Sequence, residues 1–306
     1  MALELLTYGD VSRVDDVVLN SIELLTARED SIMTILGKTE AKDTLHSYLV
    51  DSLDTPGSLA VEMGRDLTNV ALTTPSRLLN IVQEVAKTFT VARPQEKVQH
   101  FHGQNETERQ VSKALMDWGN AFEFDLIRST LTSGVSGAAA KMKGIIQAIS
   151  KSTNTTAHTS GTVMSASILD GLMQANWENS NNDVATDLYV GGLMRRNIDY
   201  FTQKSNIVVN NATGGSTIVK TVSTYETAMG TLSVHKHRYV DISGTDATLR
   251  LLAIRPEKLK IAYLDRPTIL DLAKNGPYTR KSVYGSGTLE VRNQDSNWFT
   301  SGFLRA

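Results

Sequence analysis

Between residues 105 and 131, apolar side chains recur at steps of three and four residues, which is the period of an α-helix. Asn105, followed by Glu108 three residues later, resembles a capping box with Asn in place of Ser or Thr. The pattern predicts one helix roughly 40 Å long, at ~1.5 Å per residue. Its predicted core face consists of Val111, Ala114, Leu115, Trp118, Phe122 and Leu126.

Residues 79–91 follow a different period, because apolar and polar side chains alternate there as they do in a half-buried strand. The predicted inward face of this strand consists of Leu79, Ile81, Val85, Phe89 and Val91. Residues 44–50 predict a second, weaker strand, and the polar, turn-rich segment between the two has no sustained period. If the two strands pair, they form a long hairpin with a large loop at its tip.

Such a hairpin cannot be complete by itself. An isolated ribbon of two strands is marginally stable in water and leaves both of its edges unpaired. Either the hairpin packs on its own domain, or it reaches across a neighbouring copy of the same chain. The residues alone leave both alternatives open.

The first 36 residues predict an arm with two short helices. Val14, Val17, Val18, Ile22 and Leu25 fall at helical spacing, and a second helix is predicted between a cap at Asp30 and a stop at Gly37. The rest of this segment contains few apolar residues. We therefore expect the arm to lie on another surface.

The middle of the chain predicts a compact α/β lobe, with helices at 165–179 and 192–203, a strand at 187–191 and short strands between 206 and 240. The last third returns to strands. They are predicted at 249–254, 259–264 and 286–293, around a short helix at 268–276 that Gly276 closes.

Charge and cysteine content exclude several classes of function. Lys and Arg total 31 against 33 Asp and Glu, without a long run of like charges, so tight binding of many nucleic-acid phosphates is not indicated. The absence of cysteine excludes disulfides and thiolate chemistry, and suits a reducing cytosol. The sequence contains neither a membrane-spanning apolar run nor a basic signal-peptide start, so we expect no membrane association.

Candidate chemistry is limited to two His-x-His pairs, His100 with His102 and His235 with His237. Alternate strand residues share a face, so either pair could contribute two zinc ligands, but neither has an evident third ligand. We interpret both pairs as ordinary strand histidines. Acidic pairs such as Glu123 and Asp125 are most simply solvated, and no nucleotide, hydrolase or zinc-protease signature occurs. We therefore predict neither a catalytic site nor a metal or cofactor.

Four segments carry a resemblance to a known family: DTLHSYLVDSL (43–53), KGIIQAISKSTN (143–154), YETAMGTLSVHKHRYV (225–240) and PEKLKIAYLDRPTILDLAKNGPYTRKSVYGSGTLEVRN (256–293). The chain resembles tailed-bacteriophage major capsid proteins of the HK97-like fold, in particular the SU10-type major head proteins. The resemblance implies an α+β fold in four parts. They are an N-terminal arm (1–42), an extended β-hairpin loop (43–95), a peripheral domain (96–149 and 249–306) that contains the spine helix (104–131), and an axial domain (150–248).

The resemblance also implies a function. Family members form hexamers and pentamers that close into an icosahedral shell around double-stranded DNA, and their extended loop lies over an adjacent subunit. It implies a virion protein assembled in the host bacterial cytoplasm, with separate scaffold and portal proteins and a possible decoration protein. The DNA would be enclosed without sequence-specific binding. The alternatives are an encapsulin-type nanocompartment subunit and, from another class, a His-dependent metalloenzyme.

Two departures from the family restrict what can be carried over. Some HK97-like shells are cross-linked through a lysine on the extended loop, but residues 43–86 contain no lysine, and Lys42 and Lys87 lie at the base of the loop. We therefore expect no covalent cross-link of that kind. Some relatives begin with a long scaffolding segment, whereas the arm here starts near Met1, which favours a separate scaffold protein.

Overall fold

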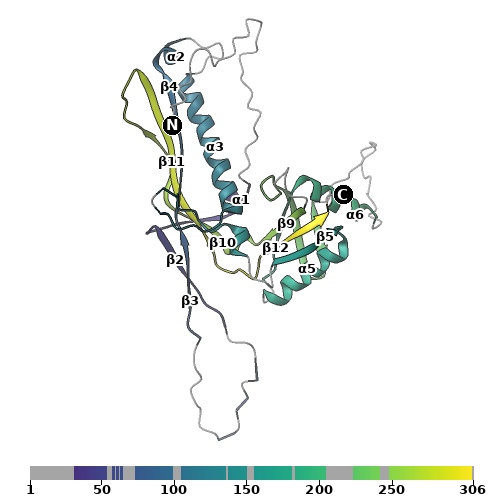
Figure 1. Cartoon of the computed structure of the whole chain (residues 1–306). Coiled ribbons are helices and arrows are strands. Elements are labelled where there is room, and N and C mark those ends of the chain that lie inside the picture. Colours follow the sequence, from purple (N-terminus) through teal and green to yellow (C-terminus); the bar gives the residue numbers. More distant parts are fainter. Residues whose placement is uncertain are drawn as a thin grey trace, which may run out of the picture.

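The computed structural model describes residues 31–304, except for 54–56, 59, 62, 65–72, 99–104, 136, 150–154, 181–182, 205–222 and 242–247. The predicted helix at 14–25, the pair His100 and His102, and the predicted strands between 206 and 222 lie outside the described residues. The described chain forms an elongated lobe, a compact lobe, and a two-stranded ribbon that projects away from both (Figure 1).

The elongated lobe consists of one long helix lying along a four-stranded sheet (Figure 1). The helix α3 (Glu106–Arg128) begins as predicted, because Asn105 Oδ1 accepts a hydrogen bond from the Thr107 amide at 3.1 Å. The sheet has the order β1-β10-β11-β4. Its strands are β1 (Gly37–Glu40), β10 (Leu259–Asp271), β11 (Tyr278–Val291) and β4 (Gln83–Ala92).

Aromatic rings of α3 approach the sheet closely because two residues of β11 lack side chains. Trp118 and Phe122 are stacked, with ring centroids 5.1 Å apart, and both are buried. A Cβ atom on Gly285 would lie 2.8 Å from the Trp118 ring, and one on Gly287 would lie 3.1 Å from Phe122. The two glycines therefore make room for the rings of the helix.

The predicted core face of α3 is wrong at one position. Trp118, Phe122 and Leu126 are buried and Val111 is half-buried, but Leu115 is 45% exposed. The buried stripe runs through Ala114 instead, because steps of four residues from 114 to 126 keep the face toward the sheet. Leu115 lies on the neighbouring line with Gly119, Glu123 and Ile127, which are buried, so this line is covered only beyond Leu115.

The ribbon consists of β2 (Leu45–Val50) and β3 (Ser76–Ile81), which pair antiparallel from Leu45 opposite Ile81 to Val50 opposite Ser76. The predicted hairpin therefore exists, but the single strand predicted over 79–91 is wrong. The chain breaks at Val82, and β4 continues in the four-stranded sheet beside β11. Part of the segment expected to form the extended loop, 43–95, thus belongs to the elongated lobe.

In the ribbon, the residues predicted to face inward are less buried than their neighbours. Leu79 is 48% exposed and Ile81 half-buried, whereas Asn80 and Val82 are buried. Because Val82 and Gln83 are both buried, the alternation shifts by one residue at the break. Beyond it, Val85 and Phe89 pack against the core beneath α3, on the face that the alternation predicts.

The compact lobe is built on a six-stranded sheet of order β5-β12-β9-β6-β8-β7. The helices α5 (Ala166–Asn179) and α6 (Gly192–Lys204) and the strand β6 (Asp187–Val190) lie where the sequence predicts them. The other strands are β5 (Thr155–Thr162), β12 (Trp298–Leu304), β9 (Thr248–Ile254), β8 (Gly230–Lys236) and β7 (Thr224–Thr227).

The last third of the chain is divided between the two lobes, contrary to the expectation that 249–306 lies wholly in the peripheral domain. β9 and β12 belong to the six-stranded sheet, and β10 and β11 to the four-stranded sheet. The helix predicted at 268–276 is also wrong. Thr268, Ile269 and Leu270 pair with β11 opposite Tyr284, Val283 and Ser282, respectively, so the long hairpin β10–β11 overrides the local helical pattern.

Two apolar cores meet at the six-stranded sheet. Leu188, Leu251 and Ala253 belong to the core that includes α5 and α6 residues, whereas Tyr189 and Leu252 join the core of α3 and the four-stranded sheet. Both faces of β6 and β9 are therefore covered, which explains their nearly continuous apolar sequences. The described residues also form three short α-helices, α1 (Ser31–Ile35), α2 (Arg93–Lys97) and α4 (Ile145–Ala148), and a 3-10 turn at Pro256–Lys258.

Candidate assembly surfaces and the junctions that place them

One face of the ribbon carries exposed leucines. Leu45, Leu49 and Leu79 share this face by register, and their exposed fractions are 47%, 69% and 48%. Arg77 and Ser47 occupy the positions between them, and Arg77 Nη2 donates to Ser47 Oγ at 2.9 Å. We call Leu45, Leu49 and Leu79 the leucine face. Toward the tip, Leu53 and Met63 are almost fully exposed.

The opposite face of the ribbon is fixed to β11 at its base. The Val291 amide donates to the Tyr48 hydroxyl at 3.1 Å, and Asn80 Nδ2 donates to the Leu289 carbonyl at 2.7 Å. His46 Nε2 lies 3.7 Å from the buried carboxylate of Glu290. Burial raises the pKa of Tyr48. These contacts fix the direction in which the ribbon leaves the elongated lobe and leave its leucine face open.

The described end of the N-terminal arm is held by one carboxylate of α3. The amide of Ile32 donates to Glu123 Oε1 and the amide of Met33 to Glu123 Oε2, both at 2.8 Å. These two amides lie in the first turn of α1, where backbone donors have no partner within the helix. Ile32 and Leu36 are buried in the core beside them. The helix predicted after Asp30 is thus present, and it lies on its own subunit.

The same carboxylate also contacts the compact lobe. His237 Nε2 lies 3.0 Å from Glu123 Oε1, and both side chains are fully buried. His237 Nδ1 accepts a hydrogen bond from the Tyr239 amide at 3.2 Å, so the ring proton is on Nε2 and points at Glu123. We call these contacts of Glu123 the Glu123 junction. The expectation that Glu123 is solvated is wrong, because it lies on the covered side of α3 beside Phe122.

Asp125 is not fully solvated either. It is half-buried and accepts a hydrogen bond from Gln83 Nε2 at 2.5 Å, and burial raises the pKa of its carboxyl group. Gln83 is the first residue of β4, directly after the break in the strand. This contact therefore helps to fix the point at which the chain passes from the ribbon to the elongated lobe.

The two histidines of the second His-x-His pair bind different carboxylates. His235 Nε2 lies 3.1 Å from Asp187 Oδ1, and its ring stacks on Tyr189, with centroids 5.2 Å apart. His237 faces Glu123 instead. Within the part of the chain that the structure describes, no three His, Asp or Glu side chains are placed to hold a metal ion. Each histidine of this pair has a structural partner.

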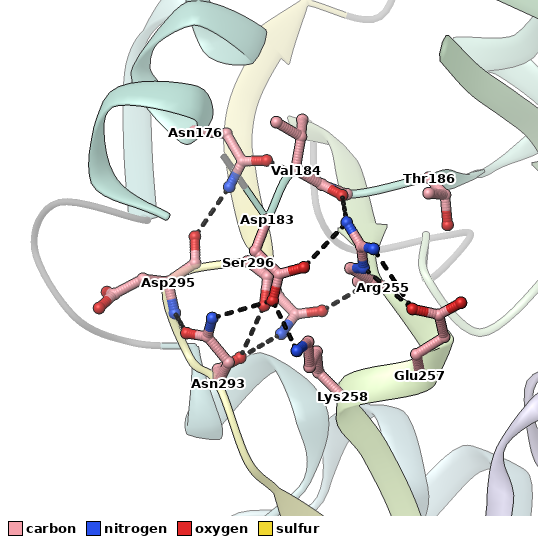
Figure 2. A network of polar contacts seen from close by, with 12 residues as sticks. Asn176, Asp183, Val184, Thr186, Arg255, Glu257, Lys258, Asn293, Asp295 and Ser296 are labelled. Carbon is pink, nitrogen blue, oxygen red and sulfur yellow. Dashed lines mark hydrogen bonds and ion pairs between the residues drawn. The ribbon is translucent and has the colours of Figure 1, made fainter. Parts of the chain in front are cut away.

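A polar network joins the two lobes where the chain crosses between them (Figure 2). Asp183 Oδ1 lies 2.9 Å from Arg255 Nη1, and Asp183 Oδ2 lies 2.9 Å from Lys258 Nζ. Arg255 and Lys258 flank the turn that connects β9 of the compact lobe to β10 of the elongated lobe. One carboxylate of the compact lobe thus holds both ends of this crossing.

The second crossing, from β11 to β12, enters the same network. Asn293 Nδ2 donates to Asp183 Oδ2 at 3.3 Å, and the Arg255 amide donates to Asn297 Oδ1 at 2.8 Å. Asn176 of α5 donates to the Asp295 carbonyl at 2.8 Å (Figure 2). The network therefore fixes both crossings to each other and to the compact lobe, and with them the angle between the lobes.

Sequence reasoning did not find Glu123, Asp183 or Tyr48. For Glu123 a signal was available, because it follows Phe122 on the apolar stripe and precedes Leu126 and Ile127, so a charge there had to be buried and paired. Asp183 and Tyr48 give no local signal. Their partners lie 72 and more residues away.

Among the described helices, none combines the length and the apolar character needed to cross a membrane.

Solved structures with low sequence identity share this fold over nearly their whole length. The capsid of the native GTA particle matches with a TM-score of 0.69 at 10% identity, over 97% of both chains. The holo-SrpI encapsulin of Synechococcus elongatus PCC 7942 gives 0.66 at 10% identity, over 95% of this chain and 93% of the encapsulin. The capsid of Myoviridae phage XM1 gives 0.61 at 13%, over 94% and 97%. The HK97-like fold that the resemblance implies is thus confirmed.

A search of curated proteins found no match. The family model of the SU10 major capsid protein matches residues 9–302. That range spans the ribbon, both lobes and both crossings between them. The chain therefore belongs to the SU10 major capsid protein family.

Proposed function

We propose that this chain builds a phage head by forming hexamers and pentamers that close into an icosahedral shell around double-stranded DNA. The observation that carries the proposal is the ribbon. It leaves the subunit with its leucine face 47–69% exposed, although a two-stranded ribbon needs further contacts to be stable. In a shell, a neighbouring subunit supplies those contacts.

The geometry suits contacts that repeat from copy to copy. The ribbon projects away from both lobes, so a ribbon that packs on the body of the next subunit would join two different surfaces (Figure 1). Contacts of this head-to-tail kind close into rings when the rotation permits. The contacts of Tyr48 and Asn80 with β11 fix the direction of the ribbon, and the polar network around Asp183 fixes the angle between the lobes. Together they would set the rotation from one subunit to the next.

The remaining parts of the proposal follow from the resemblance. Residues 1–42 would serve as the arm and the ribbon region as the extended loop, and the axial domain would include β9 and β12. We propose that the role is structural, without catalysis, and that scaffold and portal proteins are separate partners. The formal charge of −2 suits DNA that is confined by the wall and contacted without sequence preference.

Electron microscopy of the expressed full chain tests the proposal. We expect rings, closed shells or open sheets of capsomers. A monodisperse monomer at micromolar concentration, with no larger species after addition of a crowding agent, would contradict it.

An encapsulin-type compartment is the second candidate, because the SrpI encapsulin is nearly as similar in fold as the GTA capsid. The two functions differ in what the shell contains. Nuclease-resistant DNA in particles from infected cells is expected for a phage head. A co-purifying protein cargo, with no protected DNA, would favour the compartment.

A further inference from the structure

Three segments that are distant in sequence meet at the Glu123 junction. Two donors come from the arm, through the Ile32 and Met33 amides, and one comes from the compact lobe, through His237. The acceptor belongs to α3. Arm and compact lobe therefore contact the same carboxylate and share one of its oxygens, Oε1.

The junction requires a carboxylate. Glu123 Oε1 accepts from Ile32 and His237, and Oε2 accepts from Met33. A glutamine would replace one acceptor oxygen by an amide nitrogen that carries two protons, so a donor would face a donor. Because the site is fully buried, water cannot restore the lost contact.

The histidine side of the junction is equally constrained. Since His237 Nδ1 accepts from the Tyr239 amide, the ring donates to Glu123 through Nε2. The position of the turn at 237–240 thus sets where the Nε2 donor lies. Moving that turn would remove a donor from Glu123 Oε1, the oxygen that also holds Ile32.

We infer that Glu123 couples the seating of the N-terminal arm to the position of the compact lobe. Loss of the His237 contact weakens the hold on the arm, although His237 does not bond to either arm amide, and loss of an arm amide weakens the turn at 237–240. Such coupling is reciprocal by thermodynamic necessity. It deepens the proposed function, on which its consequence rests: in a shell, a subunit whose lobes shift would release or seat its arm.

Hydrogen exchange of the full chain, read by mass spectrometry in peptides covering 31–36 and 236–241, tests this coupling. The variant His237→Phe keeps a ring and removes the donor to Glu123. We expect exchange over 31–36 to become faster by up to about tenfold, because the coupling transmits to the arm part of the effect of losing one hydrogen bond to a charged group. Unchanged exchange over 31–36, with faster exchange over 236–241 alone, would overturn the inference.

The reverse experiment changes the arm. Met33→Pro removes the amide that donates to Oε2, and proline is tolerated in the first turn of a helix. The matched control Met33→Leu keeps the amide and a side chain of similar size. We expect Met33→Pro, and not Met33→Leu, to speed exchange over 236–241. Equal exchange in both variants would overturn the coupling even if His237→Phe fails to fold.

Glu123→Gln should speed exchange in both peptides. The control Glu108→Gln changes an exposed glutamate of the same helix and should change neither. Protection retained in both peptides of Glu123→Gln would also contradict the inference. The exchange is readable in dissociated subunits and in particles. Failure of the proposed function, seen as absence of particles, is therefore distinguishable from failure of the coupling.

Discussion

The core beneath α3 and the ribbon β2–β3 differ in how their apolar side chains are covered. Under α3, stacked aromatic rings fill the space that two glycines leave in β11, and the side chains are fully enclosed within the subunit. The ribbon encloses one face at its base and leaves its leucine face open. The first region is complete in one chain, whereas the second leaves a face that we propose a neighbouring copy covers.

This difference separates folding from assembly. Changes under α3 should reduce the free energy of unfolding of the subunit. Changes on the leucine face should leave the subunit folded and remove contacts between copies. The base of the ribbon lies between these cases, because its contacts belong to the subunit but would fix the direction of the proposed assembly contact.

Among changes in the core beneath α3, Trp118→Ala should lower the free energy of unfolding most. It removes a buried ring and the hydrogen bond from Trp118 Nε1 to the Val85 carbonyl, so it should cost roughly 3–5 kcal/mol of unfolding free energy. Denaturant unfolding of the subunit measures this cost. The control Leu115→Ala, at a half-exposed position of the same helix, should cost far less. Equal losses would show that the stripe through Ala114 is not the core face.

Gly285→Ala should have the next largest effect. The added methyl would lie 2.8 Å from the Trp118 ring and 3.1 Å from the backbone of Pro267, so overpacking should cost about 1–3 kcal/mol. A double variant with Trp118→Ala, which removes the clash with the ring, should lose less than the sum of the single losses. Additive losses in denaturant unfolding would refute direct contact between ring and strand.

Tyr48→Phe tests the base of the ribbon. It removes the acceptor of the Val291 amide and should cost about 1 kcal/mol. Hydrogen exchange of the peptide containing Val291 should accelerate, and assembled particles should become fewer or less regular, because the direction of the ribbon is less defined. Particles of normal yield and regularity, together with fast exchange at Val291, would show that this contact does not direct the ribbon.

The smallest effect on stability is expected from the double variant Leu49→Ser and Leu79→Ser. Both leucines are largely exposed, so unfolding free energy should change by no more than about 0.5 kcal/mol. Assembly should nevertheless fail by sedimentation and microscopy. Leu115→Ser, with comparable exposure outside the ribbon, is the matched control and should still assemble. Normal assembly of the double variant would remove the leucine face from the interface.

Much of the fold could be predicted from sequence wherever local pattern and tertiary environment agree. The helices at 106–128, 166–179 and 192–204 have caps or periods that their packing reinforces. The segment 268–276 shows the opposite case. Its local pattern favours a helix, but Thr268 and Ile269 are β-branched and pair with β11 in a long hairpin, whose register depends on residues further along the chain.

The candidate assembly surfaces were predictable in outline. The alternation over 79–91 and the turn-rich segment before it indicated a long hairpin that needs further contacts, and the ribbon is that hairpin. Its base packs on its own lobe, and contact of its leucine face with another copy stays a prediction. The break at Val82 could not be predicted, because the apolar alternation of the sequence continues across it and only the alternation of burial shifts. The partners of Asp183 and Tyr48 could not be predicted either, since these contacts exist only after both lobes have folded.

Hydrogen exchange of β2–β3 and β10–β11 in dissociated subunits and in assembled particles tests the central claim most directly. We expect the long hairpin β10–β11 to be protected in both states. We expect the ribbon to exchange quickly in the lone subunit and to become protected on assembly, because a neighbour then covers its leucine face. A ribbon as protected as β10–β11 in the lone subunit would contradict the claim that other copies complete it.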